Sequence, residues 1–132
     1  MAAKHHIDNL NGLIITDWMG DADVDKFINA YRKYQKNIRN SGELREYNEI
    51  VDFSGIQKLS FSIQDLKKYA GLAVSFDQSV KTKLALIVKS RLAHGLASGY
   101  VVLRKIDPRN NKSVKVFRNN FDALKWINSE HE

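Results

Sequence analysis

The sequence predicts one α/β domain over residues 1–132, built on a mixed, mostly parallel five-stranded sheet with about four helices. Short apolar stretches alternate with longer stretches of helical periodicity, which is typical of this class. The chain has one proline and no Gly/Ser-rich linker, so nothing divides it. The expected order is β-β-α-β-α-β-α-β-α, and right-handed crossovers between the later strands make them parallel.

A β-hairpin is expected at the start of the chain. Its strands, Lys4–Asp8 and Leu13–Met19, flank Asn9–Gly12, where Asn and Gly tolerate the positive φ of a tight turn. Asp21 or Asp23 then begins a helix by accepting hydrogen bonds from its first amides. Residues at three- and four-residue steps form its apolar face: Val24, Phe27, Ile28, Tyr31, Tyr34 or Gln35, and Ile38.

The central strand is expected at Tyr47–Gly55. Its run Ile50, Val51 and Phe53 is β-branched and aromatic, and Ser54-Gly55 is expected to end the strand in a turn. Helical patterns on both sides indicate a strand inside an α/β sheet, with the first hairpin strand at an edge.

The next helix and strand are indicated by a cap and by an apolar run. Ser62-Ile63-Gln64-Asp65 resembles a capping box with Asp in place of Glu, and therefore predicts a helix start. Leu84–Val88 is continuously apolar, as expected of a strand covered on both faces. The second helix is expected to bury Leu66, Tyr69, Ala70 and Ala73.

The last three elements follow the same logic. Ser90 is expected to cap a third helix, Val114–Phe117 to form the last strand, and Asn119 or Asn120 to cap a short helix at Phe121–Asn128. The side chains expected to face the core are Leu92, Ala93, Leu96, Ala97 and Tyr100, followed by Phe121, Leu124 and Ile127.

Charge and composition narrow the class of partner. The net charge is +6, but the basic residues, Arg104 and Lys112 among them, are scattered and predict a solvated basic surface. No alternation of aromatic and basic residues suits stacked bases, so a nucleic-acid partner is not expected.

The location of the protein is indicated by features that the sequence lacks. It has no cysteine and no apolar run long enough to span a membrane, and its N-terminus, Met1–His6, lacks the apolar core of a secretory signal peptide. We therefore expect a cytoplasmic protein that is not an integral membrane protein.

Four stretches together carry a family resemblance: Gly12–Thr16 ahead of Gly20, Ile50–Ser54, Leu84–Ser90 and Val114–Ile127. The last is the most specific, with a strand ending in Phe117 and a short helix containing Ala123 and Trp126. In this order they resemble the SpoIIAA-like branch of the STAS-like superfamily over nearly the whole chain. The resemblance implies a non-enzymatic regulatory or interaction module that acts through a protein partner. A small anionic or apolar ligand such as a lipid is the alternative, and a homo-oligomer is allowed.

The resemblance also implies a phosphorylation candidate, Ser62. In anti-sigma-factor antagonists of this superfamily, a partner kinase phosphorylates a serine in an Asp-Ser-Ser-Gly motif after the middle strand. Aligned without gaps from Asp52, the motif falls on Ser60–Ile63, and Ser62 matches a motif serine. A phosphate there would meet free helix amides. The alternative is that Ser62 is an ordinary N-cap.

An anion-binding candidate lies at the start of the third helix. Lys89, Ser90, Arg91 and His94 combine positive side chains with a helix N-terminus after a buried strand. The alternative is an ordinary cap with solvated charges.

Metal and catalytic sites are not expected. Asp17 and Asp52 near adjacent strand ends could hold Mg²⁺, but the usual role of Asp in turns explains both. The histidines show no metal-ligand spacing: His5, His6, His94 and His131. No Gly-x-Ser-x-Gly nucleophile motif occurs, so neither catalysis nor a cofactor is predicted.

Overall fold

The computed structural model describes residues 2–77 and 80–130 and confirms the predicted α/β class. The elements are β1 (Ala2–Asp8), β2 (Leu13–Ala22), α1 (Val24–Arg39), the 3₁₀ turn η1 (Leu44–Glu46), β3 (Asn48–Leu59), α2 (Ile63–Ser75), β4 (Thr82–Ile87), α3 (Arg91–Ile106), β5 (Lys112–Phe117) and α4 (Asn120–Ile127). The order agrees with the prediction, to which the structure adds η1. None of the described helices has the length and apolar character that crossing a membrane would need.

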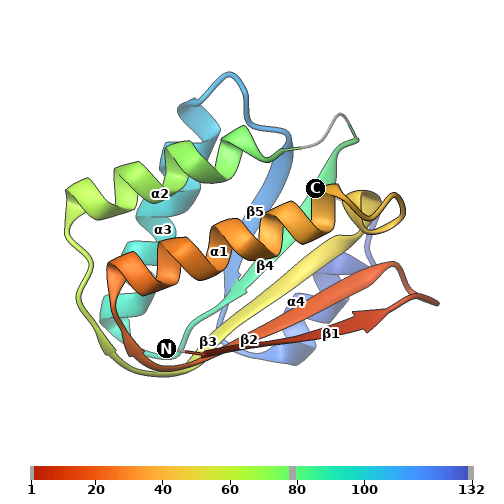
Figure 1. Cartoon of the computed structure of the whole chain (residues 1–132). Helices are drawn as coiled ribbons and strands as arrows, with labels where there is room; N and C mark the ends of the chain where they lie inside the picture. Colours follow the sequence, from red (N-terminus) through yellow and green to blue (C-terminus); the bar gives the residue numbers. More distant parts are fainter. Residues whose placement is uncertain (1, 78–79, 131–132) are drawn as a thin grey trace.

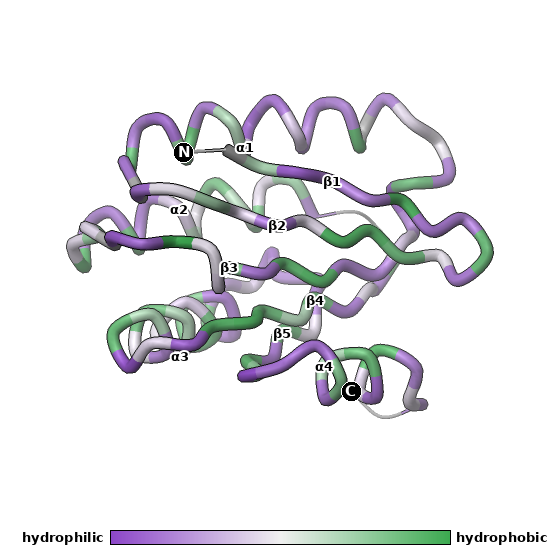
Figure 2. Tube along the Cα trace, turned by 90° about the horizontal axis from the view of Figure 1, so that it is seen from below, coloured by the Kyte–Doolittle hydropathy of each residue, from purple (hydrophilic) through white to green (hydrophobic). Residues whose placement is uncertain are grey.

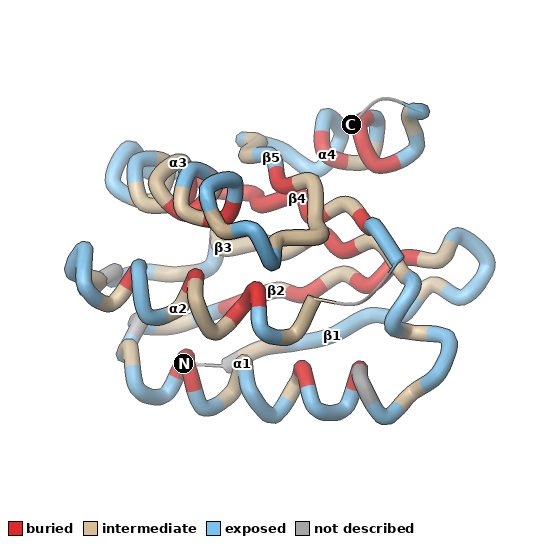
Figure 3. Tube along the Cα trace, turned by 90° about the horizontal axis from the view of Figure 1, so that it is seen from above, coloured by how far each residue is buried: buried red, intermediate tan, exposed pale blue. Residues whose placement is uncertain are grey.

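The sheet has the order β1-β2-β3-β4-β5, with β3 in the middle and β1 at one edge (Figure 1). β1 is antiparallel to β2 and the other pairs are parallel, as predicted. Helices α1, α2 and α3 pack on one face of the sheet and α4 on the other. Buried residues concentrate on the inner strands and the inward helix faces (Figure 3), and β4 is largely hydrophobic (Figure 2).

The predicted hairpin is present, although β1 begins at Ala2 instead of Lys4, and the first helix begins at a predicted cap. Gly12 has φ 59°, so the predicted turn uses the left-handed region that favours glycine. Asp23 is the N-cap of α1, and its carboxylate accepts a hydrogen bond from the amide of Lys26. Phe27 and Ile28 are buried, which confirms the predicted apolar face.

The central strand is longer than predicted, because Ser54-Gly55 lies inside β3 instead of ending it. β2 also continues and pairs with β3 as far as Leu59. Between the pairs Asp17–Asp52 and Met19–Gly55 the register shifts by one residue, which is a β-bulge. A Cβ on Gly55 would lie 2.9 Å from the carbonyl oxygen of Trp18, so glycine here permits close strand contact and not a turn.

β3 leaves its other neighbour early. Its pairing with β4 covers only residues 49–52, whereas its pairing with β2 runs over residues 48–59. β4 ends at Ile87, and the chain then turns into α3. Beyond Asp52, β3 is therefore hydrogen-bonded to β2 alone, and its last residues separate from the start of α3.

The predicted helix caps are present. Ser62 and Asp65 form the two bonds of a capping box, Ser90 accepts from the amide of Ala93, and Asn119 accepts from the amide of Asp122. These bonds satisfy backbone amides that have no partner within a helix.

Two side chains predicted to face the core are exposed. Leu92 is 61% exposed and Phe121 is 76% exposed. α3 buries a stripe containing Ala97 and Tyr100 that leaves Leu92 at its margin, while α4 inserts Ala123 and Trp126. α4 has eight residues, so periodicity locates its buried face only approximately, whereas Leu92 lies in the first turn of the longer α3, at the edge of its buried stripe.

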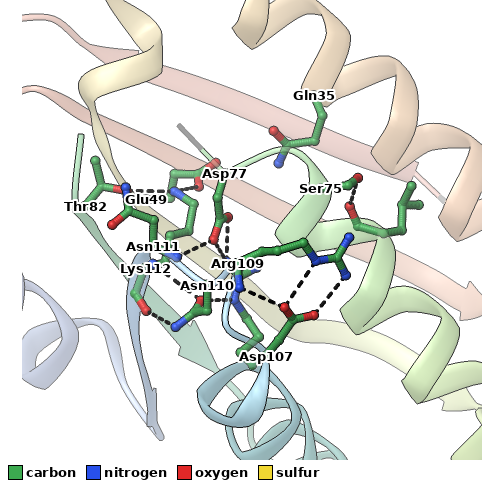
Figure 4. Close-up of polar contacts among 12 residues, drawn as sticks. Gln35, Glu49, Ser75, Asp77, Thr82, Asp107, Arg109, Asn110, Asn111 and Lys112 are labelled. Atoms are coloured by element: carbon green, nitrogen blue, oxygen red, sulfur yellow. Dashed lines mark hydrogen bonds and ion pairs between the residues drawn. The ribbon is translucent and has the colours of Figure 1, made fainter. Parts of the chain in front are cut away.

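Arg104 is buried, contrary to the prediction of a solvated basic surface. It is 1% exposed and donates to both carboxylate oxygens of Asp77. It also donates to Tyr100 Oη at 2.9 Å and to Asn110 Oδ1 at 2.9 Å. Asp77 in addition accepts from the amide of Asn111 at 2.7 Å (Figure 4). Every charge in this cluster therefore has a hydrogen-bonded partner.

Lys112 belongs to a second polar cluster, at the starts of β3, β4 and β5. Its Nζ lies 3.0 Å from Glu49 Oε2 and 2.8 Å from Thr82 Oγ1 (Figure 4). Tyr34 Oη donates to the other oxygen of Glu49 at 2.8 Å. Burial acts to raise the pKa of Glu49, but the charge of Lys112 and the hydrogen bonds from Tyr34 and Lys112 outweigh it and lower that pKa.

Candidate functional site

A pocket of about 570 Å³ lies where β3 separates from the start of α3. Its walls come from β3, from the end of β4, and from the facing sides of α2 and α3. The β3 residues are Phe53, Ser54, Ile56 and Gln57, and Phe27 of α1 and Phe61 ahead of α2 complete the lining. The volume falls within the roughly 300–1,000 Å³ typical of small-molecule sites. The pocket thus occupies the end of the sheet where open α/β folds bind ligands.

The interior of the pocket is apolar and aromatic. The rings of Tyr69 and Tyr100 stack with centroids 5.0 Å apart, and Phe27 meets Tyr69 edge-on at 5.0 Å. Ala93 and Ala97 face this space from α3 and occupy little of it. Burial raises the pKa of Tyr69 and of Tyr100, so both hydroxyls stay neutral at physiological pH. These surroundings suit an apolar group.

The polar part of the wall lies at the strand ends. It consists of Ser54, Gln57, Lys89 and Ser90. Lys89 is the charged residue of the lining, and within residues 2–77 and 80–130 no Asp or Glu contributes to it. Ser54 Oγ is buried and has no hydrogen-bond partner in the described part of the chain. Ser90 Oγ is already engaged by the amide of Ala93 at 3.0 Å.

The four residues of the predicted anion site separate into two groups. Lys89 and Ser90 line the pocket, whereas Arg91 and His94 do not. The residues of α3 that line it begin with Leu92 and Ala93, so Arg91 and His94 occupy other sides of the helix. The structure therefore brings two of the four candidates to one cavity.

Ser62 is exposed at the start of α2, next to Phe61 of the pocket lining. Its Oγ accepts from the amide of Asp65 at 3.1 Å, while the Asp65 carboxylate accepts from the amide of Ser62 at 2.9 Å. The hydrogen bonds to the backbone and side chain of Ser62 lower the pKa of Asp65. A phosphate on Ser62 would therefore lie close to a carboxylate as well as to helix amides.

Asp17 and Asp52 are cross-strand neighbours on β2 and β3, so the expectation that they cap turns is wrong. Asp52 Oδ1 accepts from the amide of Ser54 at 2.8 Å. No group of three or more metal-ligating side chains occurs among the residues described here, and His131 lies outside them.

A second depression, of about 380 Å³, lies beside the loop between α3 and β5. Arg104 and Lys112 line it, but they are held by Asp77 and Glu49 respectively. Both charges are therefore already neutralised by ion pairs within the protein. This makes the second depression the weaker candidate for a ligand-binding site.

Sequence reasoning missed most of the pocket wall. Ser54 was assigned to a turn, and Tyr69 and Tyr100 were assigned only to the core. The available signal was the position of Ser54 beside Lys89 at the ends of adjacent central strands, where ligands bind in open sheets.

Comparisons with protein-family models, curated proteins and solved structures found no match. The resemblance to the SpoIIAA-like branch therefore stays a hypothesis. The geometry of the pocket supplies the argument for function.

Proposed function

We propose that this protein is a non-enzymatic binding module that holds a small lipid-like ligand in the pocket between β3, α2 and α3. The observation that carries the proposal is a cavity of about 570 Å³ with an aromatic and aliphatic interior and a polar end. Such a cavity gains free energy from the apolar surface that a ligand removes from water.

The lining favours binding over catalysis. General acid–base chemistry uses groups that change protonation near the working pH, most often His or a carboxylate. The described lining contains neither, and Tyr69 and Tyr100 have raised pKa values. The pocket is therefore better suited to holding a ligand than to transforming one.

A matched pair of variants on α3 tests this function. Ala93→Phe places a ring in the pocket wall, whereas Gly95 lies outside the lining and a Cβ added there meets no atom within 4 Å beyond its chain neighbours and the backbone of its own helix. Titration with an apolar fluorophore should show saturable binding to the wild type and to Gly95→Phe. Ala93→Phe should bind at least about tenfold more weakly, a loss of about 1.4 kcal/mol.

Circular dichroism must first show that both variants are folded. Native mass spectrometry of the purified protein then reports any small molecule that it carries. The proposal fails if the wild type binds no apolar probe, or if Ala93→Phe binds as well as Gly95→Phe.

Regulation through a protein partner is the second candidate, as the family resemblance implies. It is favoured by the start of α2, where the hydroxyl of Ser62 lies beside Ile63, an apolar side chain that is 70% exposed. An exposed apolar residue next to a phosphorylatable serine suits a contact that phosphate would disrupt. Affinity capture with the wild type and with Ser62→Asp should recover a partner only with the wild type. Equal recovery by the two would count against this switch.

A further inference from the structure

We propose that the ligand of this pocket is an amphipathic monocarboxylate, with its apolar tail inside and its carboxylate between Lys89 and Ser54. This inference rests on the proposed function and adds the chemistry of the head group. It follows from one unpaired cation and one unsatisfied hydroxyl on the same wall.

Lys89 sets the charge of the head group. It is exposed at the pocket rim and makes no ion pair with the described part of the chain. Asp52, which pairs with Ile87 two residues before Lys89, is not part of the lining, and its carboxylate accepts from the amide of Ser54. An ammonium group on a ligand would be repelled by Lys89, and the described lining has no carboxylate to offset that repulsion. A ligand with one negative charge would instead be attracted to Lys89.

Ser54 supplies the second contact. Asp52 pairs with Ile87 in the parallel register, and Ser54 and Lys89 each lie two residues further along the chain, Lys89 just beyond the end of β4. Both residues therefore lie at the carboxyl end of the sheet, and both line the pocket there. Ser54 Oγ is buried and has no partner among the residues that the structure describes, a state that costs free energy. The hydroxyl hydrogen of Ser54 rotates about the Cβ–Oγ bond, so the hydroxyl can donate to a carboxylate oxygen placed beside it in the pocket.

The number of cations favours a carboxylate over a phosphate. Phosphate carries up to two charges and is commonly held by the fork of an arginine. Arg91 is the arginine closest in sequence to Lys89, and it does not line the pocket. A single lysine and a hydroxyl match the one charge and two oxygens of a carboxylate.

A series of ligands with one common tail tests the inference. Dodecanoate, dodecanol, dodecylammonium and dodecyl phosphate are titrated below their micelle concentrations by displacement of a bound fluorophore. Dodecanoate should bind about tenfold more tightly than dodecanol, as expected for one charge-assisted hydrogen bond. Dodecylammonium should bind most weakly.

Three variants assign this preference to residues. Lys89→Gln should abolish the preference of dodecanoate over dodecanol, while Lys67→Gln, an exposed lysine of α2 outside the lining, should leave it unchanged. Ser54→Ala should reduce the preference without lowering the thermal stability, because the hydroxyl that it removes has no partner.

The outcomes separate this inference from the proposed function. If no compound of the series binds, both fail. If all four bind with equal affinity and Lys89→Gln changes nothing, the pocket stands and the carboxylate head group is wrong. Tighter binding of dodecyl phosphate than of dodecanoate also overturns the inference, in favour of a phosphate.

Discussion

Replacing Arg104 with methionine removes a buried cation while keeping a long, flexible side chain. Arg104 is 1% exposed and Asp77 is equally enclosed, with 3% of its side chain exposed. Among residues 2–77 and 80–130, Arg104→Met leaves the Asp77 carboxylate with the amide of Asn111 as its remaining hydrogen-bond donor. Breaking one side of a buried ion pair costs about 3–5 kcal/mol, because an uncompensated charge stays in a poorly solvated site.

The cost converts into a large shift of the melting temperature. Unfolding entropy is about 2.1 cal/mol/K per residue, or roughly 0.28 kcal/mol/K for 132 residues. The expected decrease in Tm is therefore about 11–18 °C. Thermal melts by circular dichroism measure this decrease, and urea unfolding gives the free energy independently.

Arg109→Met is the matched control. Arg109 pairs with Asp107 but is 58% exposed, and solvent screens such pairs, so its Tm should hardly change. Adding Asp77→Leu to Arg104→Met should restore part of the lost stability, because no charge is then left buried. The reasoning is refuted if Arg104→Met melts within about 3 °C of the wild type, a loss of under about 1 kcal/mol.

Two further predictions concern α3 and the Glu49 cluster. Gly95→Ala should raise the free energy of unfolding in urea by up to about 1 kcal/mol. Gly99→Ala should raise it less, because the added Cβ would lie 3.2 Å from Leu66 Cδ2. Equal gains in the two variants would contradict this reasoning. The pKa of Glu49 is lower in the folded chain than its ordinary 4.5, because Lys112 and its hydrogen bonds overcome burial. The stability from this carboxylate is thus present above about pH 4.5 and is lost as the pH falls through the lower folded pKa. Glu49→Gln should flatten the acid-side dependence of the unfolding free energy, and an unchanged slope would exclude this role.

Local signals in the sequence were enough for the order of elements and for the caps. Asn9–Gly12, Asp23, Ser62 and Ser90 act through contacts within a few residues, so the sequence alone determines them. The continuous apolar run of β4 likewise predicts a strand covered on both faces.

Features that depend on distant partners were not predictable in this way. Glycine is common in turns, so the sequence predicts that Gly55 ends the strand. In the structure, β2 continues beside Gly55 and pairs with it, so Gly55 stays in the sheet. Arg104 of α3 is buried because Asp77, from the segment after α2, accepts from it with two oxygens. Of the residues that line the pocket, the sequence predicts a binding role only for Lys89 and Ser90, because a helix cap and a strand end are visible in the local sequence. A cavity is formed by several segments that are distant in the sequence, so its other lining residues are not predicted.

The early separation of β3 from β4 determines how the cavity can vary. The space comes from the path of the main chain, because β3 continues beside β2 after β4 has turned into α3. Side chains of different size at a lining position such as Leu96 would reshape the outline of the cavity while the backbones that enclose it stay in place. The same scaffold can therefore accommodate tails of different length and branching while its strand register stays constant.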